Sequence, residues 1–514
     1  MAPMSALARS APPVVLPLPA LRRGVPQATI AVFLNSGGDE RIRLNPLTGR
    51  TRYGTKAAPA EDEIWFSSST ASCVDPRSFA AAADVLARLV GPRGSYESIK
   101  DGDIASWFAQ LRRRLLALFG IPGAEAVLSA SGTDAEFIAL SAAQAMLARP
   151  LTNIVMGSDE AGSGVMMAAA GRHFLASSCL GGAVTPGLPL QGFDRHPIET
   201  QAIAIRDAAG YPRDPAEIDR EAALLVAQAL AAGRDVVLHV LDASQTGLSG
   251  VTRETARALA AQARGRMAII VDACQLRCPP ARLRDDLGAG FMVMISGSKF
   301  ASGPPFAGAL LLPPALVEGM RGQTRAPSGL AAYSARFDWP EILRNGFAAD
   351  LDQPINLGLG LRWEAALAAI EPYFALPEVL RMQVLAWFAG AVHRLVAARP
   401  HLRQLTGEPS RAKTIIPIAT SGHAATPAGA AALHAALAAP LAPAHALHAP
   451  SRACHLGAPM AIGDKTALRL CASMPLVLDI AARIMDGQRI EAAVAPVRDD
   501  LNVLFEKWDA LAGA

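Results

Sequence analysis

The sequence predicts an α/β protein in which helices cover a mostly parallel sheet. From about residue 75 to 330, helical patterns such as SFAAAADVLARLV alternate with short apolar runs such as DVVLHVLD and MAIIVDA. This alternation is typical of parallel strands connected by helices. The runs are nearly continuous in apolar residues, as expected of strands buried on both faces. With 514 residues, 51% of them hydrophobic, the chain is long enough for two or three domains.

The chain divides into three predicted regions. Residues 1–60 are rich in Pro, Gly and Arg and lack a sustained period, so we expect an irregular N-terminal extension. Residues 61–350 are expected to form the large domain. Residues 351–514 are expected to form a smaller α+β domain, with a long helical stretch from LGLGLRWE onward, strands at TIIPIAT and ALRLCAS, and a closing helix near 476–487.

Composition argues against two classes of partner. The 48 Lys and Arg residues nearly balance the 45 Asp and Glu residues, and no basic stripe is interleaved with aromatics, so we expect no nucleic-acid partner. No uninterrupted run reaches the ~18 apolar residues of a membrane span, so we expect no membrane partner. Prolines interrupt the apolar N-terminus, which does not resemble a signal peptide. We therefore expect a cytoplasmic protein.

Neither disulfides nor a metal site are expected. The six cysteines include no CxxC pair and no Cys/His cluster at zinc spacing, which fits a reducing cytosol. The segment 421–450, predicted as a helix and a loop, contains His434, His445 and His448. Flanking prolines and the lack of a carboxylate there favour solvated loop residues over a metal site.

The residues expected to carry chemistry lie in the segment 266–312. A buried strand ends in Asp272, a second ends at Ser296, and Lys299 follows in a Ser/Gly turn. Because open α/β sheets bind ligands at the carboxyl ends of their strands, the two side chains are expected to converge. This pair suits pyridoxal 5′-phosphate (PLP), since the carboxylate keeps the pyridine nitrogen protonated and the lysine forms the Schiff base. Taken singly, the two residues are explained as a turn cap and a solvent-exposed lysine.

A second feature is the helix start within SASGTDAEFIAL at 129–140. Ser131, Gly132 and Thr133 directly precede an apolar helix. Free backbone N–H groups and the positive end of the helix dipole favour an anion there, which we expect to be the phosphate of the cofactor. Ser and Thr also cap helices for structural reasons alone. The order of phosphate loop, aspartate and lysine along the chain favours the anion site.

From about residue 64 to 490 the chain resembles the class V aminotransferase and cysteine desulfurase superfamily, a branch of the fold type I PLP enzymes. The resemblance rests on IWFSSSTASCVDPR at 64–77, DASQTG at 242–247, VDACQ at 271–275, SGSK at 296–299 and ALRLCAS at 467–473. It implies an aspartate-aminotransferase-like large domain with a mostly parallel seven-stranded sheet, followed by a small α+β domain. It also implies a homodimer.

The resemblance implies several contacts with the cofactor besides Asp272 and Lys299. Gln275 would hydrogen-bond the phenolic oxygen, and Ser296 would bind the phosphate. Thr246 lies in a stretch whose polar side chains meet the cofactor oxygen. Asn356 lies where a loop would contact the phosphate bound by the second subunit.

The resemblance also implies contacts with the substrate. Arg469 would clamp the α-carboxylate of an amino acid, a task that suits a bidentate guanidinium. Ser244 lies in DASQTG and Thr70 lies in IWFSSSTASCVDPR, and both residues would contact the substrate together with Arg469. An arginine in an exposed strand is otherwise a surface residue.

Two departures from the family pattern bear on the reaction. The stretch MGSDEAGSGV at 156–165 places Ala161 or Gly162 where desulfurases usually carry a histidine that stacks on the cofactor ring. Ser298 precedes the lysine, where desulfurases often have histidine. A usual acid/base group is thus missing, and transaminase-like members become relevant.

Cys454, in SRACHLGAP, precedes Arg469 at a separation that resembles the desulfurases with a persulfide cysteine over the active site. We expect it as a candidate nucleophile, because Arg452 and His455 could lower the pKa of its thiol. The alternative is a buried, inert cysteine.

The sequence therefore predicts a PLP enzyme that binds an amino acid as an external aldimine. Lyase or carbon-bond-remodelling chemistry at Cα or Cβ, similar to that of cysteine desulfurases, is the first hypothesis. A class V aminotransferase is the alternative. A third hypothesis is a non-catalytic protein of the PLP fold that binds a partner through its N-terminal extension.

Overall fold

Seven strands form the larger of two sheets, in the order β2-β8-β7-β6-β5-β3-β4. Their bounds are β2 Glu125–Ser129, β3 Leu151–Met156, β4 Ile198–Ile203, β5 Asp235–Leu241, β6 Met267–Ala273, β7 Met292–Ser296 and β8 Gly308–Leu312. Strand β8 is antiparallel to both of its neighbours, β2 and β7. The other pairings are parallel, so every strand of this sheet except β8 points its carboxyl end at the same edge.

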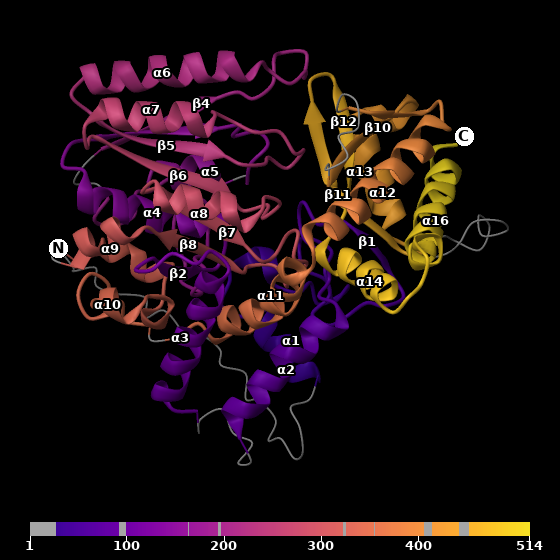
Figure 1. Cartoon of the computed structure of the whole chain (residues 1–514), viewed down its shortest axis with the longest axis horizontal. Helices are drawn as coiled ribbons and strands as arrows, with labels where there is room; N and C mark the ends of the chain where they lie inside the picture. The colour runs from indigo at the N-terminus through magenta and orange to yellow at the C-terminus, as the bar shows by residue number, and fades with distance from the viewer. Residues whose placement is uncertain are drawn as a thin grey trace, which may run out of the picture.

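The computed structural model describes residues 27–91, 99–162, 164–193, 197–321, 325–353, 355–405, 414–440 and 452–513. Helices cover both faces of the larger sheet (Figure 1). On one face lie α4 Gly132–Met146, α5 Val165–Ala169 and α9 Pro314–Arg321, with α10 Glu341–Arg344 beside α9. On the other lie α6 Pro215–Ala231, α7 Arg253–Ala263 and α8 Pro280–Gly288.

Strand β7 shows why its sequence is continuously apolar. Met292 and Met294 belong to the apolar cluster beneath α4, whereas Val293 and Ile295 belong to the cluster on the opposite face. Successive side chains of a strand point to opposite faces, and both faces here are buried. The predicted mostly parallel sheet with helices on both sides is therefore confirmed.

A second sheet of five strands has the order β1-β11-β12-β10-β9. Its strands are β1 Ile64–Phe66, β9 Leu402–Gln404, β10 Ile415–Thr420, β11 Cys454–Ile462 and β12 Lys465–Cys471. The short strand β1 pairs in parallel with β11, whereas the other pairings are antiparallel. A strand from the region expected in the large domain thus belongs to the C-terminal sheet.

The helices of the second domain and the linking helices complete the molecule. With the second sheet lie α12 Glu378–Ala397, α13 Pro427–Leu437, α14 Met474–Met485, α15 Ile490–Ala493 and α16 Ala495–Ala512. The long helix α11 Leu357–Ala375 contacts α1 Gln27–Leu34, α2 Pro76–Val90, α3 Asp101–Ala117 and α14. It therefore links the N-terminal helices to the second domain.

The ends of the chain differ from the sequence-based expectations. The extension expected to be irregular contains α1 and a short 3-10 helix at Glu40–Ile42. The helix expected to close the chain near 476–487 corresponds to α14, and the chain continues into α15 and α16. Helix α16 buries Leu501, Leu504, Phe505 and Trp508 at helical spacing, a periodicity that the sequence contains.

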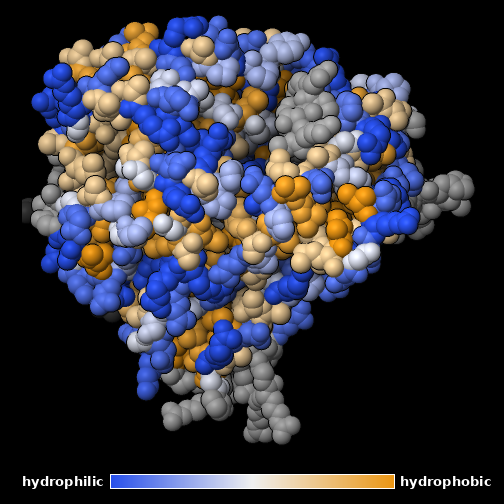
Figure 2. All heavy atoms as spheres, in the orientation of Figure 1, coloured by the Kyte–Doolittle hydropathy of each residue, from blue (hydrophilic) through white to orange (hydrophobic). Residues whose placement is uncertain are grey.

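Hydrophilic residues cover most of the face seen in Figure 2, with apolar residues in smaller groups between them. The exposed large apolar side chains include Val379 and Met382 on α12. No helix within the described ranges is long and apolar enough to cross a membrane.

Lys507 on α16 offers a test of the packing of the second domain. Its fully buried ammonium group donates to the carbonyl oxygens of Leu437, Ala439 and Arg452 at 2.6–2.8 Å. We expect Lys507→Met to lower the free energy of unfolding by about 3 kcal/mol, because it leaves buried acceptors unpaired. Urea unfolding measures the change.

The control is Lys465→Met, which removes a partly exposed lysine paired with exposed Asp464. Its loss should stay below about 1 kcal/mol. Equal losses in the two variants would contradict a structural role for the buried ammonium group.

Candidate active site

The predicted residues of the large domain gather at the edge where the carboxyl ends of the parallel strands lie. Asp272 is near the end of β6, and Lys299 follows β7. Cα pairings align Asp272 with Leu241 of β5 on one side and with Met294 of β7 on the other. This edge is where open α/β sheets bind ligands.

The predicted phosphate loop lies between β2 and α4. Ser131 is the N-cap of α4, where its hydroxyl accepts a hydrogen bond from the backbone N–H of Asp134 at 3.2 Å and donates to the Asp134 carboxylate. A Cβ atom on Gly132 would lie 2.6 Å from the Sγ atom of Cys274. The missing side chain thus lets the start of α4 lie against the end of β6, beside Asp272.

Behind Asp272 lies a buried histidine that the sequence analysis did not single out. The Nε2 atom of His239 on β5 is 3.2 Å from Oε1 of Glu136 on α4. Burial lowers the pKa of His239, but the Glu136 carboxylate and then Asp272 outweigh it and raise that pKa above its ordinary value. On the other side, Asp272 accepts a hydrogen bond from the backbone N–H of Cys274 at 3.0 Å.

The turn that carries Lys299 is held from several sides. The backbone N–H of Gly297 donates to the carbonyl oxygen of Ala307 at 2.7 Å, so the turn is closed where β7 and β8 pair. Ser296, predicted to bind phosphate, accepts a hydrogen bond from the backbone N–H of Ser298 at 3.1 Å. The Ser298 hydroxyl in turn accepts from the N–H of Ala307 at 2.8 Å.

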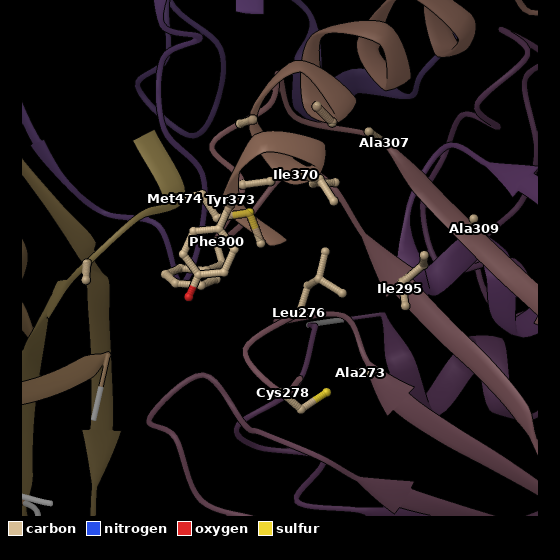
Figure 3. Packing of buried hydrophobic residues seen from close by; sticks show 14 of the residues in the cluster. Ala273, Leu276, Cys278, Ile295, Phe300, Ala307, Ala309, Ile370, Tyr373 and Met474 are labelled. Carbon is tan, nitrogen blue, oxygen red and sulfur yellow. The ribbon is translucent and has the colours of Figure 1, made fainter. Parts of the chain in front are cut away.

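Phe300, the residue after Lys299, anchors this turn to the second domain. Its ring meets Tyr373 of α11 edge to face, with centroids 5.3 Å apart. Its carbonyl oxygen accepts a hydrogen bond from the backbone N–H of Met474, the first residue of α14, at 2.7 Å. Figure 3 shows Phe300, Tyr373 and Met474 together at this junction. The lysine turn is therefore fixed by both domains.

Ser244 and Thr246, predicted to contact the substrate and the cofactor, both donate to the buried carboxylate of Glu160, Ser244 at 2.6 Å. Glu160 also forms an ion pair with Arg206, which donates to the Thr246 hydroxyl at 2.8 Å. These four side chains follow the ends of β3, β4 and β5. They form one buried polar cluster at the edge of the sheet.

Arg469 on β12 is 1% exposed and lies next to this cluster. Its guanidinium donates to the side-chain oxygen of Gln245 at 2.7 Å, to the Thr70 hydroxyl at 3.0 Å and to the carbonyl oxygen of Ala458 at 2.9 Å. Burial lowers its pKa. Arg469 lies on β12 and Thr70 lies in the loop that follows β1, and both were predicted to contact the substrate. The structure places both side chains next to the loop after β5.

Gln275 links the end of β6 to the loop that follows β1. Its amide nitrogen donates to the carbonyl oxygen of Ser69 at 3.1 Å, and its amide oxygen accepts from Arg277 at 3.3 Å. Arg277, which the sequence analysis did not single out, also donates to the Ser68 hydroxyl at 2.9 Å and stacks over the ring of Phe300 at 4.7 Å. Burial lowers its pKa to about 10.

The side chain of Asn356 forms hydrogen bonds within its own subunit. Its side-chain oxygen caps α11 by accepting from the N–H of Leu359 at 3.1 Å, and its nitrogen donates to the carbonyl oxygen of Gly37 at 2.9 Å. The expected contact with the phosphate in a second subunit stays a prediction. Of the three histidines expected to be solvated loop residues, His434 instead lies half-buried on α13, with its Nε2 atom 3.1 Å from the carbonyl oxygen of Leu456, so that expectation is wrong for His434; the other two lie outside the described residues.

The surroundings of Cys454 do not suit a nucleophile. The residue is fully buried in β11, and burial raises the pKa of its thiol to about 11. His455 is turned away toward Glu63, 2.8 Å from its carboxylate, and stacks on Trp65. Within the described residues the structure shows no contact by which His455 would activate the thiol, so the buried, inert alternative fits this site better, and a nucleophilic Cys454 stays a prediction.

The site fits PLP in two respects. Asp272 lies near the end of β6 and Lys299 follows the neighbouring parallel strand β7, and a capped helix start with a glycine lies against the end of β6. Ala161 and Gly162, which the sequence analysis placed where desulfurases usually carry a histidine, lie close to the predicted phosphate loop. A Cβ atom on Gly162 would already lie 3.3 Å from the Thr133 hydroxyl.

No family model and no curated protein sequence matches this chain. Solved structures do match it. Phosphoserine aminotransferase SerC from Cytophaga hutchinsonii aligns with a TM-score of 0.51 at 13% identity, over 86% of this chain and 99% of that one. The cystine C–S lyase C-DES, in complex with cysteine persulfide, aligns with a TM-score of 0.51 at 15% identity, over 85% and 98%. This chain has the aspartate-aminotransferase-like fold.

A second C-DES structure, a variant with glycine covalently linked to the PLP cofactor, aligns with a TM-score of 0.52 at 14% identity, over 85% of this chain and 97% of that one. The matches therefore assign one aspartate-aminotransferase-like fold to most of the chain. This fold confirms the predicted seven-stranded sheet followed by a smaller α+β domain.

The polar residues that the sequence analysis missed include Glu160, Arg206, Gln245, Arg277 and His239. Glu160 and Gln245 stand beside residues that were singled out, Ala161 and Ser244, so their positions carried a signal. Arg206 follows a strand end, as the predicted residues do. The sequence contains no comparable signal for His239, which lies within an apolar strand.

Cys454→Ala tests the inert thiol. We expect this variant to keep any catalytic turnover that the wild-type protein shows, because the thiol is buried and mostly protonated near neutral pH. Iodoacetamide should modify Cys454 in urea but not in the native protein, as peptide mass spectrometry would show. A variant that binds cofactor normally yet loses turnover would make Cys454 the nucleophile after all.

Proposed function

We propose that this protein is a PLP-dependent enzyme that acts on an amino acid by lyase or carbon-bond-remodelling chemistry at Cα or Cβ. The observation that carries this proposal is the placement of Asp272 near the end of β6 and of Lys299 just after the adjacent parallel strand β7, with the capped start of α4 beside the end of β6. The similarity to C-DES, whose structures contain the PLP cofactor with glycine and a complex with cysteine persulfide, supports a lyase.

PLP supplies an electron sink that stabilises negative charge at the substrate carbon next to the amino group. The protein has to bind the cofactor, set its charge and move protons. We assign its phosphate to the backbone N–H groups at Ser131–Thr133 and to Ser296. Asp272 would hold a proton at the ring nitrogen, and Glu136 with His239 would keep that carboxylate in a polar setting.

Lys299 would hold the cofactor covalently and then move protons at the substrate carbon. Because Ala161 and Gly162 supply no acid/base group, Lys299 is the general base that we assign. Contacts of the neighbouring Phe300 with both domains keep this turn in place and exclude water from its apolar side.

Arg469 and Thr70 would bind the α-carboxylate of the substrate. The guanidinium now donates to the side-chain oxygen of Gln245, which a carboxylate oxygen would replace. Ser244 and Thr246, held by Glu160, would keep the loop after β5 in position for the substrate carboxylate and the phenolic oxygen, with Gln275 close by.

We further propose a homodimer, in which Asn356 lies near the phosphate of the partner's cofactor, and an amino acid as the small-molecule substrate. The six cysteines are free and buried, which suits a reducing compartment such as the cytoplasm. A class V aminotransferase remains the second candidate, supported by the similarity to phosphoserine aminotransferase.

Absorption spectroscopy tests the cofactor. The wild-type protein incubated with PLP should gain a near-visible band that borohydride removes, with the mass of reduced PLP added to the peptide that contains Lys299. Lys299→Ala should lack this covalent adduct, because it has no amine to form it. The control is Lys465→Ala, which removes a partly exposed lysine outside the proposed site and should behave as wild type. A wild-type protein that takes up no PLP would refute the proposal.

A single-turnover test separates the two candidate reactions. An aminotransferase given only an amino donor should convert its cofactor to the pyridoxamine form and release a keto acid. The lyase that we propose should keep its initial spectrum after turnover and release the fragment cleaved from Cα or Cβ. Stoichiometric pyridoxamine formation with several amino acids, without cleavage products, would favour the aminotransferase.

A further inference from the structure

The segment from Leu34 to Arg41, which we call the N-terminal segment, is held by hydrogen bonds from helix α11. Arg362 on α11 is 0% exposed, and its guanidinium donates to the carbonyl oxygens of Leu34 at 3.2 Å, Ser36 and Gly37 at 2.9 Å. Burial lowers its pKa to about 9. The arginine thus serves as a hydrogen-bonding clamp on this segment.

Two glycines allow the segment to lie so close to α11. Gly37 has φ +64°, and a Cβ atom on it would lie 1.8 Å from the side-chain oxygen of Asn356. A Cβ atom on Gly358, in the first turn of α11, would lie 2.4 Å from the carbonyl oxygen of Ser36. Neither position accepts a side chain without moving the segment or the helix start.

The far end of the segment lies near the phosphate loop. Arg41 is paired with Asp39 at 2.6 Å and is stacked between the rings of Phe306, at 4.8 Å, and Phe174, at 5.2 Å. Asp134 in the first turn of α4 is fully buried, and its Oδ1 atom has no hydrogen-bond partner among the described residues. Burial raises the pKa of Asp134 to about 6, against the opposing effect of Arg41.

Phe306 connects the N-terminal segment to the lysine turn and to the phosphate loop, the two parts of the proposed cofactor site. Its carbonyl oxygen accepts the fourth hydrogen bond of Arg362, at 2.7 Å, and its backbone has φ +77°. The next residue, Ala307, pairs with Gly297 and Ser298 in the lysine turn. A Cβ atom on Gly308 would then lie 2.8 Å from the carbonyl carbon of Ser131 in the phosphate loop.

We infer that the N-terminal segment is a positioning element of the cofactor site, held by Arg362 and Asn356, which fixes Phe306 and through it the phosphate loop and the lysine turn. This inference rests on the proposed PLP function for its consequence, since displacement of the segment weakens cofactor binding. It assigns a role to a part of the extension that the sequence left without one.

Gly37→Ala tests the inference, with Gly49→Ala as its matched control. Gly49 lies in the same extension and has φ +65°, but a Cβ atom there meets nothing within 4 Å. Both variants carry the same backbone strain, and only Gly37→Ala pushes against Asn356. Asn356→Ser in the Gly37→Ala background shortens the opposing side chain while keeping a helix-capping residue, and should bring the amide exchange of residues 34–41 back toward that of the Gly49→Ala control. Arg362→Lys, which loses the planar fork, is a second way to release the segment.

Two measurements are made on each full-length variant. Amide hydrogen exchange without cofactor should quicken in residues 34–41, 129–134 and 297–308 for Gly37→Ala and Arg362→Lys, but not for Gly49→Ala. The dissociation constant for PLP should rise about 10-fold or more in the first two variants, as for other supporting groups behind a bound cofactor.

The outcomes separate the two proposals. If residues 34–41 exchange faster while the phosphate loop, the lysine turn and the PLP affinity match the Gly49→Ala control, the segment supports nothing and the inference is wrong. If the wild-type protein takes up no PLP, the proposed function fails, and exchange in the loop and the turn still decides the inference by itself.

Discussion

The site depends on the common direction of the strands in the larger sheet. Because β2, β7, β6, β5, β3 and β4 all point their carboxyl ends at one edge, the loops that follow them converge without any long excursion of the chain. Strand β8 runs in the opposite direction and lies between β2 and β7. Because β2 is antiparallel to β8, it points in the same direction as β7. Strand β8 also follows β7 in the chain with no helix between them, so the lysine turn connects two directly paired strands.

Charged groups connect the two domains across this edge. Arg469 from the second sheet donates to Gln245 of the large domain, and Arg277 from the large domain donates to Ser68 and to carbonyl oxygens of the second domain. Arg469 is buried and Arg277 is partly buried, and both are bound by neutral oxygens. Such contacts are directional, and they fix the separation of the domains more closely than apolar packing alone would. A carboxylate entering beside Arg469 would therefore act on both domains at once.

The fold and the central pair were predictable because both depend on local patterns. Short apolar runs ending in Asp272 and Ser296 identify strand ends, and strand direction follows from the intervening helices. The environment of a residue was less predictable. Cys454 has Arg452 and His455 as sequence neighbours, but side chains of successive residues in a strand point to opposite faces, so His455 faces Glu63 while the thiol is buried. His239 depends on a contact between β5 and α4, which no local pattern encodes. Arg206 and Glu160 likewise meet only once β3 and β4 have paired.

The pairing of β1 with β11 brings together residues from opposite ends of the chain. During synthesis on the ribosome the larger sheet has all of its strands once β8 has emerged, whereas the second sheet lacks its central strands until residue 471 is made. Until then β1 remains an unpaired apolar strand, in a form prone to association with other chains. The nascent chain is therefore most exposed to aggregation in the interval between completion of its first sheet and arrival of β11.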